Sequence, residues 1–147
     1  MEELTIAQAH EAFKNSNEDG SSLTSRKLTE YYMQRIKQFD VGIINSISAI
    51  SNNALAEAEA LDAYFARTNT LIGPLHGIPV LVKGQVDTKG LLTTYGSKVF
   101  EKNIPAEDAV LVQKLKKAGA VILGKTTMPG QFDSFIHSFR YTTSASW

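Results

Sequence analysis

The stretch that most constrains the fold is an apolar run that follows a turn rich in Gly and Pro and ends on a lysine. Ile78 to Val82 is apolar without interruption, and Lys83 and Gly84 come directly after it. A short continuous apolar run bounded by turn residues predicts a strand that is buried on both faces, as in a parallel sheet. Open α/β sheets bind ligands beyond the carboxyl ends of such strands. We therefore expect an α/β sheet that carries Lys83 at its ligand-binding edge.

This feature alone leaves two interpretations of Lys83 open. In the first, the amine is partly desolvated at the sheet edge, and desolvation favours its neutral, basic form. In the second, the aliphatic stem covers the end of the strand while the amine extends into water. The choice between them depends on the rest of the chain.

The remaining sequence predicts helices before this strand and a strand–helix–strand unit that begins with it. Apolar residues recur at helical spacing in residues 5–13, 24–39 and 52–67, and residues 43–50 form a candidate strand. Residues 107–118 predict a helix that Gly119 terminates, and residues 120–123 predict a second buried strand. A helix between two such strands predicts parallel pairing through a right-handed crossover.

The predicted fold class is therefore α/β, with N-terminal helices followed by βαβ units of a mostly parallel sheet. We expect one domain over residues 1–147, divided into a helical region at 1–70, a βαβ core at 71–129 and an irregular tail at 130–147. No internal repeat, low-complexity tract or linker divides the sequence.

Composition excludes several classes of function. Fifteen basic and fifteen acidic residues leave no net charge, so neither nucleic acid nor an anionic membrane is an expected partner. The N-terminus lacks the pattern of a signal peptide, and no apolar run approaches the roughly 20 residues of a membrane span. We expect a soluble cytoplasmic protein. Without cysteine, and with three scattered histidines, the chain is expected to hold no metal and no cofactor.

The sequence contains a match to the P-loop motif that we interpret as coincidental. Residues 119–126 fit the P-loop pattern G-x-x-x-x-G-K-[ST]. A P-loop needs its central residues to form a turn around phosphate, with a helix directly after it. Here residues 120–123 predict a strand, and Met128-Pro129 interrupts any following helix. We expect no nucleotide site at this position.

Around Lys83 the sequence resembles the amidase signature family. The matching segments are Gly73-Pro-Leu-His-Gly-Ile-Pro-Val-Leu-Val-Lys83, Gln85-Val-Asp-Thr88, Gly90, Thr93-Thr94, Gly96-Ser97 and Lys117-Ala-Gly-Ala-Val-Ile-Leu-Gly-Lys-Thr-Thr-Met-Pro129. The resemblance implies an α/β sandwich, here incomplete, and a hydrolase of carboxamides with a Ser–Ser–Lys triad. It implies that Lys83 is the catalytic lysine. Met128 falls where the family's wall of a pocket for a small amide substrate often lies, and the alternative is an ordinary core methionine.

The chain departs from the family pattern in two places. The family's two serines lie in a Gly-Gly-Ser-Ser-Gly-Gly-Ser-like segment, and residues 131–147 contain nothing similar. Ser134, Ser138, Ser144 and Ser146 lack the flanking glycines that would form an oxyanion hole. Gly84 stands where the family usually has Asp. The chain thus carries the base without its nucleophile.

Two functions remain open. The chain is either the N-terminal part of an amidase that is active only with the missing half, or a truncated, catalytically inactive relative that serves as a binding or interaction module. In either case, strands that lack their neighbours leave an unpaired sheet edge, through which the chain could self-associate.

Overall fold

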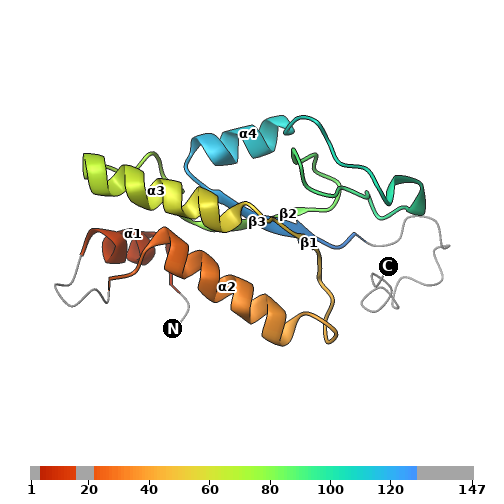
Figure 1. The fold of residues 1–147 in the computed structure, drawn as a ribbon, viewed down its shortest axis with the longest axis horizontal. Coiled ribbons are helices and arrows are strands. Elements are labelled where there is room, and N and C mark those ends of the chain that lie inside the picture. Colours follow the sequence, from red (N-terminus) through yellow and green to blue (C-terminus); the bar gives the residue numbers. More distant parts are fainter. Residues whose placement is uncertain (1–3, 16–21, 129–147) are drawn as a thin grey trace.

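The computed structural model describes residues 4–15 and 22–128, which form helices around a small sheet (Figure 1). The elements in chain order are α1 (Ile6–Lys14), α2 (Ser25–Phe39), β1 (Ile47–Ile50), α3 (Ala54–Thr68), β2 (Pro79–Lys83), the 3-10 helix η1 (Lys98–Phe100), α4 (Val110–Lys117) and β3 (Val121–Thr126).

The sheet has three strands in the order β1-β3-β2. β2 pairs with β3 in parallel, and Lys83 lies opposite Thr126 in that register. The predicted βαβ unit is therefore confirmed, with α4 as its crossover helix. β1 pairs with β3 in the antiparallel direction, with Ile50 opposite Gly124. The α/β class is confirmed, but the described sheet is mixed rather than mostly parallel.

The burial predicted for the Lys83 strand is wrong for the described part of the chain. β2 is an edge strand in which only Val82 is buried, and Leu81 is 37% exposed. The strand with buried residues on both faces is β3, which lies between the other two and is buried from Val121 to Lys125. The apolar run at 78–82 identified a strand, but the strand's place in the sheet depends on partners far away in sequence.

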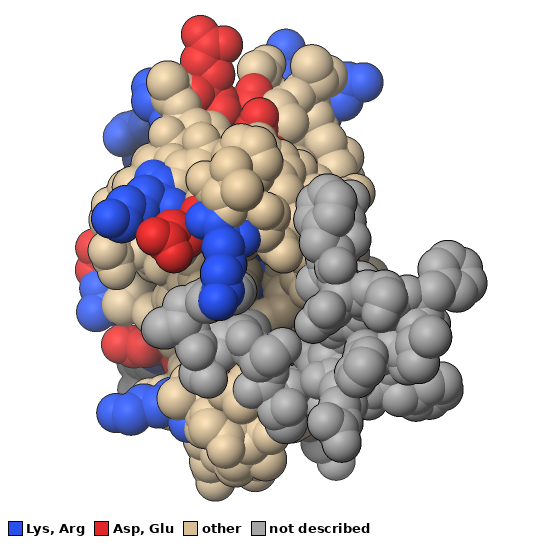
Figure 2. Space-filling view, turned by 90° about the vertical axis from the view of Figure 1, so that its right-hand side faces the viewer, with Lys and Arg blue, Asp and Glu red and all other residues tan. Residues whose placement is uncertain are grey.

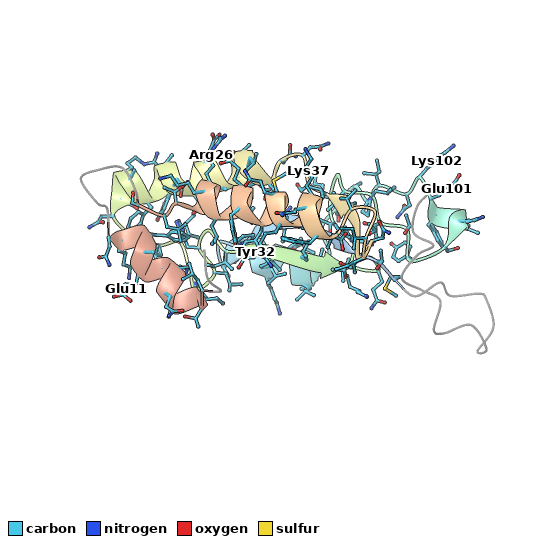
Figure 3. The ribbon with its side chains drawn as sticks, turned by 90° about the horizontal axis from the view of Figure 1, so that it is seen from below. Glu11, Arg26, Tyr32, Lys37, Glu101 and Lys102 are labelled. Carbon is cyan, nitrogen blue, oxygen red and sulfur yellow. The ribbon has the colours of Figure 1, made fainter. Side chains whose placement is uncertain are left out.

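Helices cover both faces of β3. On one face, α2 and α3 pack against each other and against Val121 and Leu123. On the other face, Val112 of α4 packs against Ile122 of β3 and Val82 of β2. Figure 1 shows α2 and α4 on opposite sides of the strands, and Figure 3 shows Tyr32 on the side of α2 away from Arg26 and Lys37. The sheet therefore forms the middle layer of a small α/β/α arrangement.

Local capping explains where the first two helices begin. The Thr5 hydroxyl accepts from Gln8 N–H at the start of α1, and Thr24 accepts from Lys27 N–H at the start of α2. Each bond satisfies a donor that the first helical turn leaves free. The predicted helices at 5–13, 24–39 and 52–67 are confirmed within one or two residues.

The helix expected at 107–118 begins later than predicted. Glu107 and Asp108 precede α4, which starts at Val110. Asp108 is occupied elsewhere: it accepts from Lys89 N–H at 2.7 Å and forms an ion pair with Lys116 at 2.8 Å. Gly119 ends the helix with a φ of +91°, as its place after the helix predicted.

The strand expected at 43–50 is shorter because a buried carboxylate folds its first residues into turns. Asp40 accepts hydrogen bonds from Ser46 N–H at 2.7 Å and from Ile47 N–H at 3.1 Å. Its backbone carbonyl accepts from Asn45 N–H at 2.8 Å. These bonds hold residues 40–46 in a compact loop, so β1 begins only at Ile47.

Gly124 is required by the close approach of β1 to β3. A Cβ atom at this position would lie 2.3 Å from the carbonyl oxygen of Ala49, which is backbone and cannot rotate away. We expect Gly124→Ala to lower the free energy of unfolding by about 2 kcal/mol, because the central strand must separate from its neighbour. Urea unfolding followed by circular dichroism measures the change.

Gly90→Ala is the matched control for this prediction. A Cβ at Gly90 has nothing within 4 Å, so that variant carries only the strain of a left-handed φ of +72°, about 1 kcal/mol. Equal destabilisation by the two variants would show that the contact between Gly124 and Ala49 does not limit the sheet.

Candidate functional site

Lys83 lies where three strand ends meet. It is the last residue of β2, and its Nζ donates a hydrogen bond to the carbonyl oxygen of Thr127 at 2.5 Å. Thr127 N–H in turn donates to the Ser46 carbonyl at 2.8 Å, next to the start of β1. The structure thus places the lysine at the carboxyl edge of the parallel pair, as the sequence predicted.

The amine is more open than the first interpretation of Lys83 required. The residue is exposed, and within residues 4–15 and 22–128 its amine has one hydrogen-bond partner, the Thr127 carbonyl. The partial desolvation expected from the sequence is therefore not found in the described part of the chain.

A groove lies on the same face of the sheet as Lys83. Side chains alternate along a strand, so Pro79, Leu81 and Lys83 point to one face of β2. Pro79 and Leu81 line a groove of about 490 Å³ between this strand, α2 and the loop after α2. The other lining residues are Tyr32, Arg35, Ile36, Phe39, Asp40, Ile44, Ser46, Ile47 and Leu123. Lys83 therefore comes two residues after Leu81, which lines the apolar groove, and lies on the same face of the strand.

Gly84, the residue directly after Lys83, lies beside Met128. Its N–H donates to the Thr126 carbonyl at 2.9 Å, which continues the ladder beyond Lys83. A Cβ at Gly84 would lie 2.9 Å from that oxygen and 3.1 Å from Cγ of Met128. Met128 is half-buried and takes the space beside Gly84. A side chain at this position would therefore need both the Thr126 backbone and Met128 to shift.

The loop after Lys83 is held by hydrogen bonds to Asp87. The Tyr95 hydroxyl donates to the Asp87 carboxylate, and this bond raises the pKa of the Tyr95 phenol above its ordinary value. The Asp87 carbonyl accepts from Ala109 N–H at 2.9 Å. Asp87 thus orients neighbours and links the loop to the start of α4.

Lys125 is the site residue that the sequence patterns did not reveal. Its side chain is completely buried in β3, where it lies opposite Val82. Its amine donates to the Val86 carbonyl and to the Thr88 hydroxyl, both in the loop after Lys83. Burial lowers the pKa of this amine to about 8, and the nearby Asp87 opposes that shift.

The predicted strand at 120–123 ends two residues before Lys125, which lies in the formal P-loop match and in the family segment at 117–129. In the structure β3 continues through Thr126, so residues 121–126 are extended and hydrogen-bonded on both sides. The prediction that this segment is a strand, not a phosphate-binding turn, is confirmed. Extending the strand pattern by two residues would have placed Lys125 inside the sheet.

The histidines have structural partners where they are described. His76 is 1% exposed, its Nδ1 accepts from Ile72 N–H at 3.2 Å, and burial lowers its pKa. His10 Nε2 contacts the His76 carbonyl oxygen at 3.0 Å. His137 and the serines at 134, 138, 144 and 146 lie outside the described residues. Among residues 4–15 and 22–128, no three His, Cys, Asp or Glu side chains are grouped to hold a metal ion.

Charge on the visible surface is mixed. Figure 2 shows basic and acidic side chains interspersed over one end of the molecule. In the part of the chain that the structure describes, no helix is long and apolar enough to cross a membrane.

The family model "Amidase" matches residues 27–143. The chain is 36% identical over 146 residues to a Glutamyl-tRNA(Gln) amidotransferase subunit of Dehalococcoides mccartyi, covering 98% of this chain and 29% of that protein. It is 41% identical over 108 residues to the subunit of the same name from Acinetobacter baumannii, covering 74% of this chain and 22% of the relative.

Solved structures agree with these matches. The peptide amidase of Stenotrophomonas maltophilia superimposes with a TM-score of 0.77 at 34% identity, over 87% of this chain and 25% of that one. A fatty acid amide hydrolase superimposes with a TM-score of 0.71 at 28% identity, over 86% of this chain and 21% of that one. The chain therefore spans less than a third of the length of these relatives.

Proposed function

Because this chain belongs to the amidase family, we propose that it supplies the base for hydrolysis of a carboxamide C–N bond, with Lys83 in that role. The observation that carries the proposal is the position of Lys83: it ends β2 at the carboxyl edge of the sheet, on the face that holds the apolar groove. The peptide amidase and the fatty acid amide hydrolase are both named for reactions at amide bonds, which supports the reaction class.

The proposed chemistry is that of an activated serine nucleophile. The lone pair of a neutral Lys83 takes a proton from a bridging serine, which takes the proton of the nucleophilic serine. The serine oxygen attacks the amide carbon, the C–N bond breaks as the nitrogen is protonated, and water then hydrolyses the acyl-serine ester. Backbone N–H groups of a glycine-rich segment stabilise the oxyanion. The two serines and that segment have no counterpart in the sequence of this chain, so we propose that they come from further polypeptide.

Two contacts in the structure suit Lys83 to this role. The hydrogen bond to the Thr127 carbonyl directs the amine along the sheet edge and leaves its lone pair free when it is neutral. Met128 stands beside Gly84, directly after the lysine, so we propose that it forms part of the wall facing the substrate. A small amide with an apolar acyl group fits the groove lined by Leu81, Phe39 and Ile44.

A chimera tests this proposal. Residues 4–128 of this chain replace the matching part of the Stenotrophomonas maltophilia peptide amidase, which supplies the rest of the polypeptide. We expect the chimera to hydrolyse amides at a rate well above that of the buffer. A folded chimera without turnover would contradict the proposal that this chain carries a working base.

The 147-residue chain on its own is expected to hydrolyse simple aryl and alkyl amides no faster than buffer. The reason is that Lys83 has no serine to deprotonate within the described residues, and the sequence lacks the Gly/Ser-rich segment. Release of an aryl amine measured by absorbance provides the assay. Turnover by this chain that disappears in Lys83→Ala would show that the nucleophile is present after all.

A second function, a non-catalytic interaction module, is favoured by the apolar surface around the groove. Phe39 is 47% exposed, Ile44 50% and Leu81 37%, and β2 has an unpaired edge in the described sheet. Such an edge is a template for pairing with another chain. We propose that two copies of this chain associate through it.

Self-association is therefore expected to depend on concentration and on Leu81. Sedimentation velocity should show a dimer that grows with protein concentration, and Leu81→Glu should shift the chain to monomer by placing a charge in the contact. Lys102→Glu, at the exposed end of the molecule near η1, is the control (Figure 3). A monomer at all concentrations would contradict the proposal that two copies of this chain associate through the β2 edge.

A further inference from the structure

The amine of Lys125 is buried in the middle of the sheet, where a charged residue is rarely found. Lys125 is the largest of the fully buried side chains in the described residues, and it occupies the central strand opposite Val82. An apolar side chain would fill such a place without the cost of desolvating an amine. The amine forms hydrogen bonds with two oxygen atoms, and the location of these oxygens indicates its role.

Both oxygens belong to the loop that leaves Lys83. The Lys125 amine donates to the Val86 carbonyl and, at 3.3 Å, to the Thr88 hydroxyl. The same hydroxyl donates to the Val86 carbonyl at 3.1 Å, so the three groups close a small hydrogen-bonded ring. This ring lies on the face covered by α4, because Val82 and Val86 pack there.

The loop held in this way is bonded directly to Lys83. Val86 N–H donates to the Lys83 carbonyl at 2.9 Å, and Tyr95 N–H donates to the Gly84 carbonyl at 3.2 Å. Residues 84–88 therefore form a tight turn whose position fixes the backbone of Lys83. Because side chains alternate along β2, Lys83 points away from the face that holds Lys125.

We propose that Lys125 is a positioning residue: its buried amine holds residues 84–88 by hydrogen bonds and thereby sets the place of Lys83 at the edge of the sheet. The inference rests on the proposed function only in giving Lys83 its role as base. The link between the amine, the loop and the Lys83 carbonyl is a property of the chain itself.

Amide hydrogen exchange of the 147-residue chain tests the link. Lys125→Met keeps an unbranched side chain that is one heavy atom shorter and removes the hydrogen-bond donors. We expect the exchange rates of the Val86 and Tyr95 amides to rise by about tenfold, because local opening of the loop becomes easier. The Val121 amide, which donates to the Ile78 carbonyl at the other end of the strands, reports opening of the whole sheet.

Ile122→Val is the matched control for packing, because it removes a buried methylene from the same strand and the same face while leaving the hydrogen bonds of the loop in place. In that variant the Val86, Tyr95 and Val121 amides are expected to change together. If Lys125→Met also changes all three amides together, or leaves Val86 at the rate of the unmodified chain, the proposal is overturned.

Thr88→Val provides a second route to the same answer should Lys125→Met not fold. It removes the hydroxyl of the ring while keeping the shape of the residue, and Thr88 is 2% exposed. We expect faster exchange at Val86 with Val121 unchanged. The effects of the two variants should also be less than additive in the double variant, since both break one network. Unchanged exchange at Val86 in Thr88→Val contradicts the proposal.

A spectroscopic signature separates positioning of the loop from loss of packing. The bond from the Tyr95 hydroxyl to Asp87 raises the pKa of the phenol, and it depends on where residues 84–88 lie. Phenolate absorbance, with Tyr95→Phe as the reference, should show this pKa falling toward its ordinary value in Lys125→Met and staying in place in Ile122→Val. None of these measurements needs turnover, so an inactive chimera overturns the role of Lys83 and leaves this inference standing.

Discussion

Lys83→Ala in the chimera is expected to lower amide turnover by about 10²–10⁴-fold, the range for losing a positioned general base. The side chain ends an edge strand, is exposed, and makes one hydrogen bond in the described part of the chain, to the Thr127 carbonyl. Its removal should therefore leave the fold intact. Initial rates of amide hydrolysis give the effect, and circular dichroism checks the fold.

Lys83→Arg sharpens this test. Arginine keeps a positive charge and several hydrogen-bond donors, but it does not lose its proton in proteins. If Lys83 works as a base, the Arg variant is as inactive as the Ala variant. If it only supplies charge or a donor to the Thr127 carbonyl, the Arg variant keeps most of the turnover. Lys37→Ala, which changes an exposed lysine on the side of α2 away from Tyr32, should have no effect (Figure 3).

Raising the pH from 7 to 10 is expected to stabilise the fold through Lys125 by about 2–3 kcal/mol. Burial holds the pKa of this amine at about 8 in the folded chain, against 10.5 for an ordinary lysine. Between these two values the unfolded chain binds more protons than the folded chain, so the free energy of unfolding rises with pH. Below pH 8 both states are protonated, and the cost of burying the charge is fully present.

The contribution of Lys125 is isolated by comparison with Lys125→Met. Tyr95 acts in the opposite direction, because its raised pKa means that stability is lost as the pH rises above the ordinary value of 10. Making the comparison in a Tyr95→Phe background removes this contribution, so the difference between the urea unfolding curves at pH 7, 8, 9 and 10 reports Lys125. A difference that does not change with pH would show that the buried amine does not titrate in this range.

Lys83 and Lys125 lie near the same edge of the sheet but differ in burial. Lys83 and Lys125 come from neighbouring strands, but the first is exposed on an edge strand and the second is enclosed in the central one. Lys83 stands out in the sequence for its place in a family pattern, and the burial expected of it is not found in the described structure. Lys125 has the more unusual environment, and neither of the two patterns that contain it, the formal P-loop match and the family segment at 117–129, predicts its burial. The strand pattern at 78–83 and the one at 120–126 look alike when read along the chain.

Helices were predicted well because their signals are local. A capping threonine precedes α1 and α2, apolar residues recur every three or four positions, and Gly119 stops α4. The start of α4 was placed too early because Asp108, a typical first-turn residue, bonds instead to Lys89 and Lys116. The partners that moved this boundary lie 19 and 8 residues away along the chain.

The helices, the βαβ unit and the lysine at the end of its first strand follow from local patterns, because capping, periodicity and turn residues act over a few neighbouring positions. The tertiary structure alone decided that β1 runs antiparallel, that β2 lies at an edge, that Met128 sits against Gly84 and that Lys125 is buried under the Lys83 loop. These features depend on which strand lies in the middle of the sheet. That choice is made by pairing and packing between segments tens of residues apart, which no local pattern records.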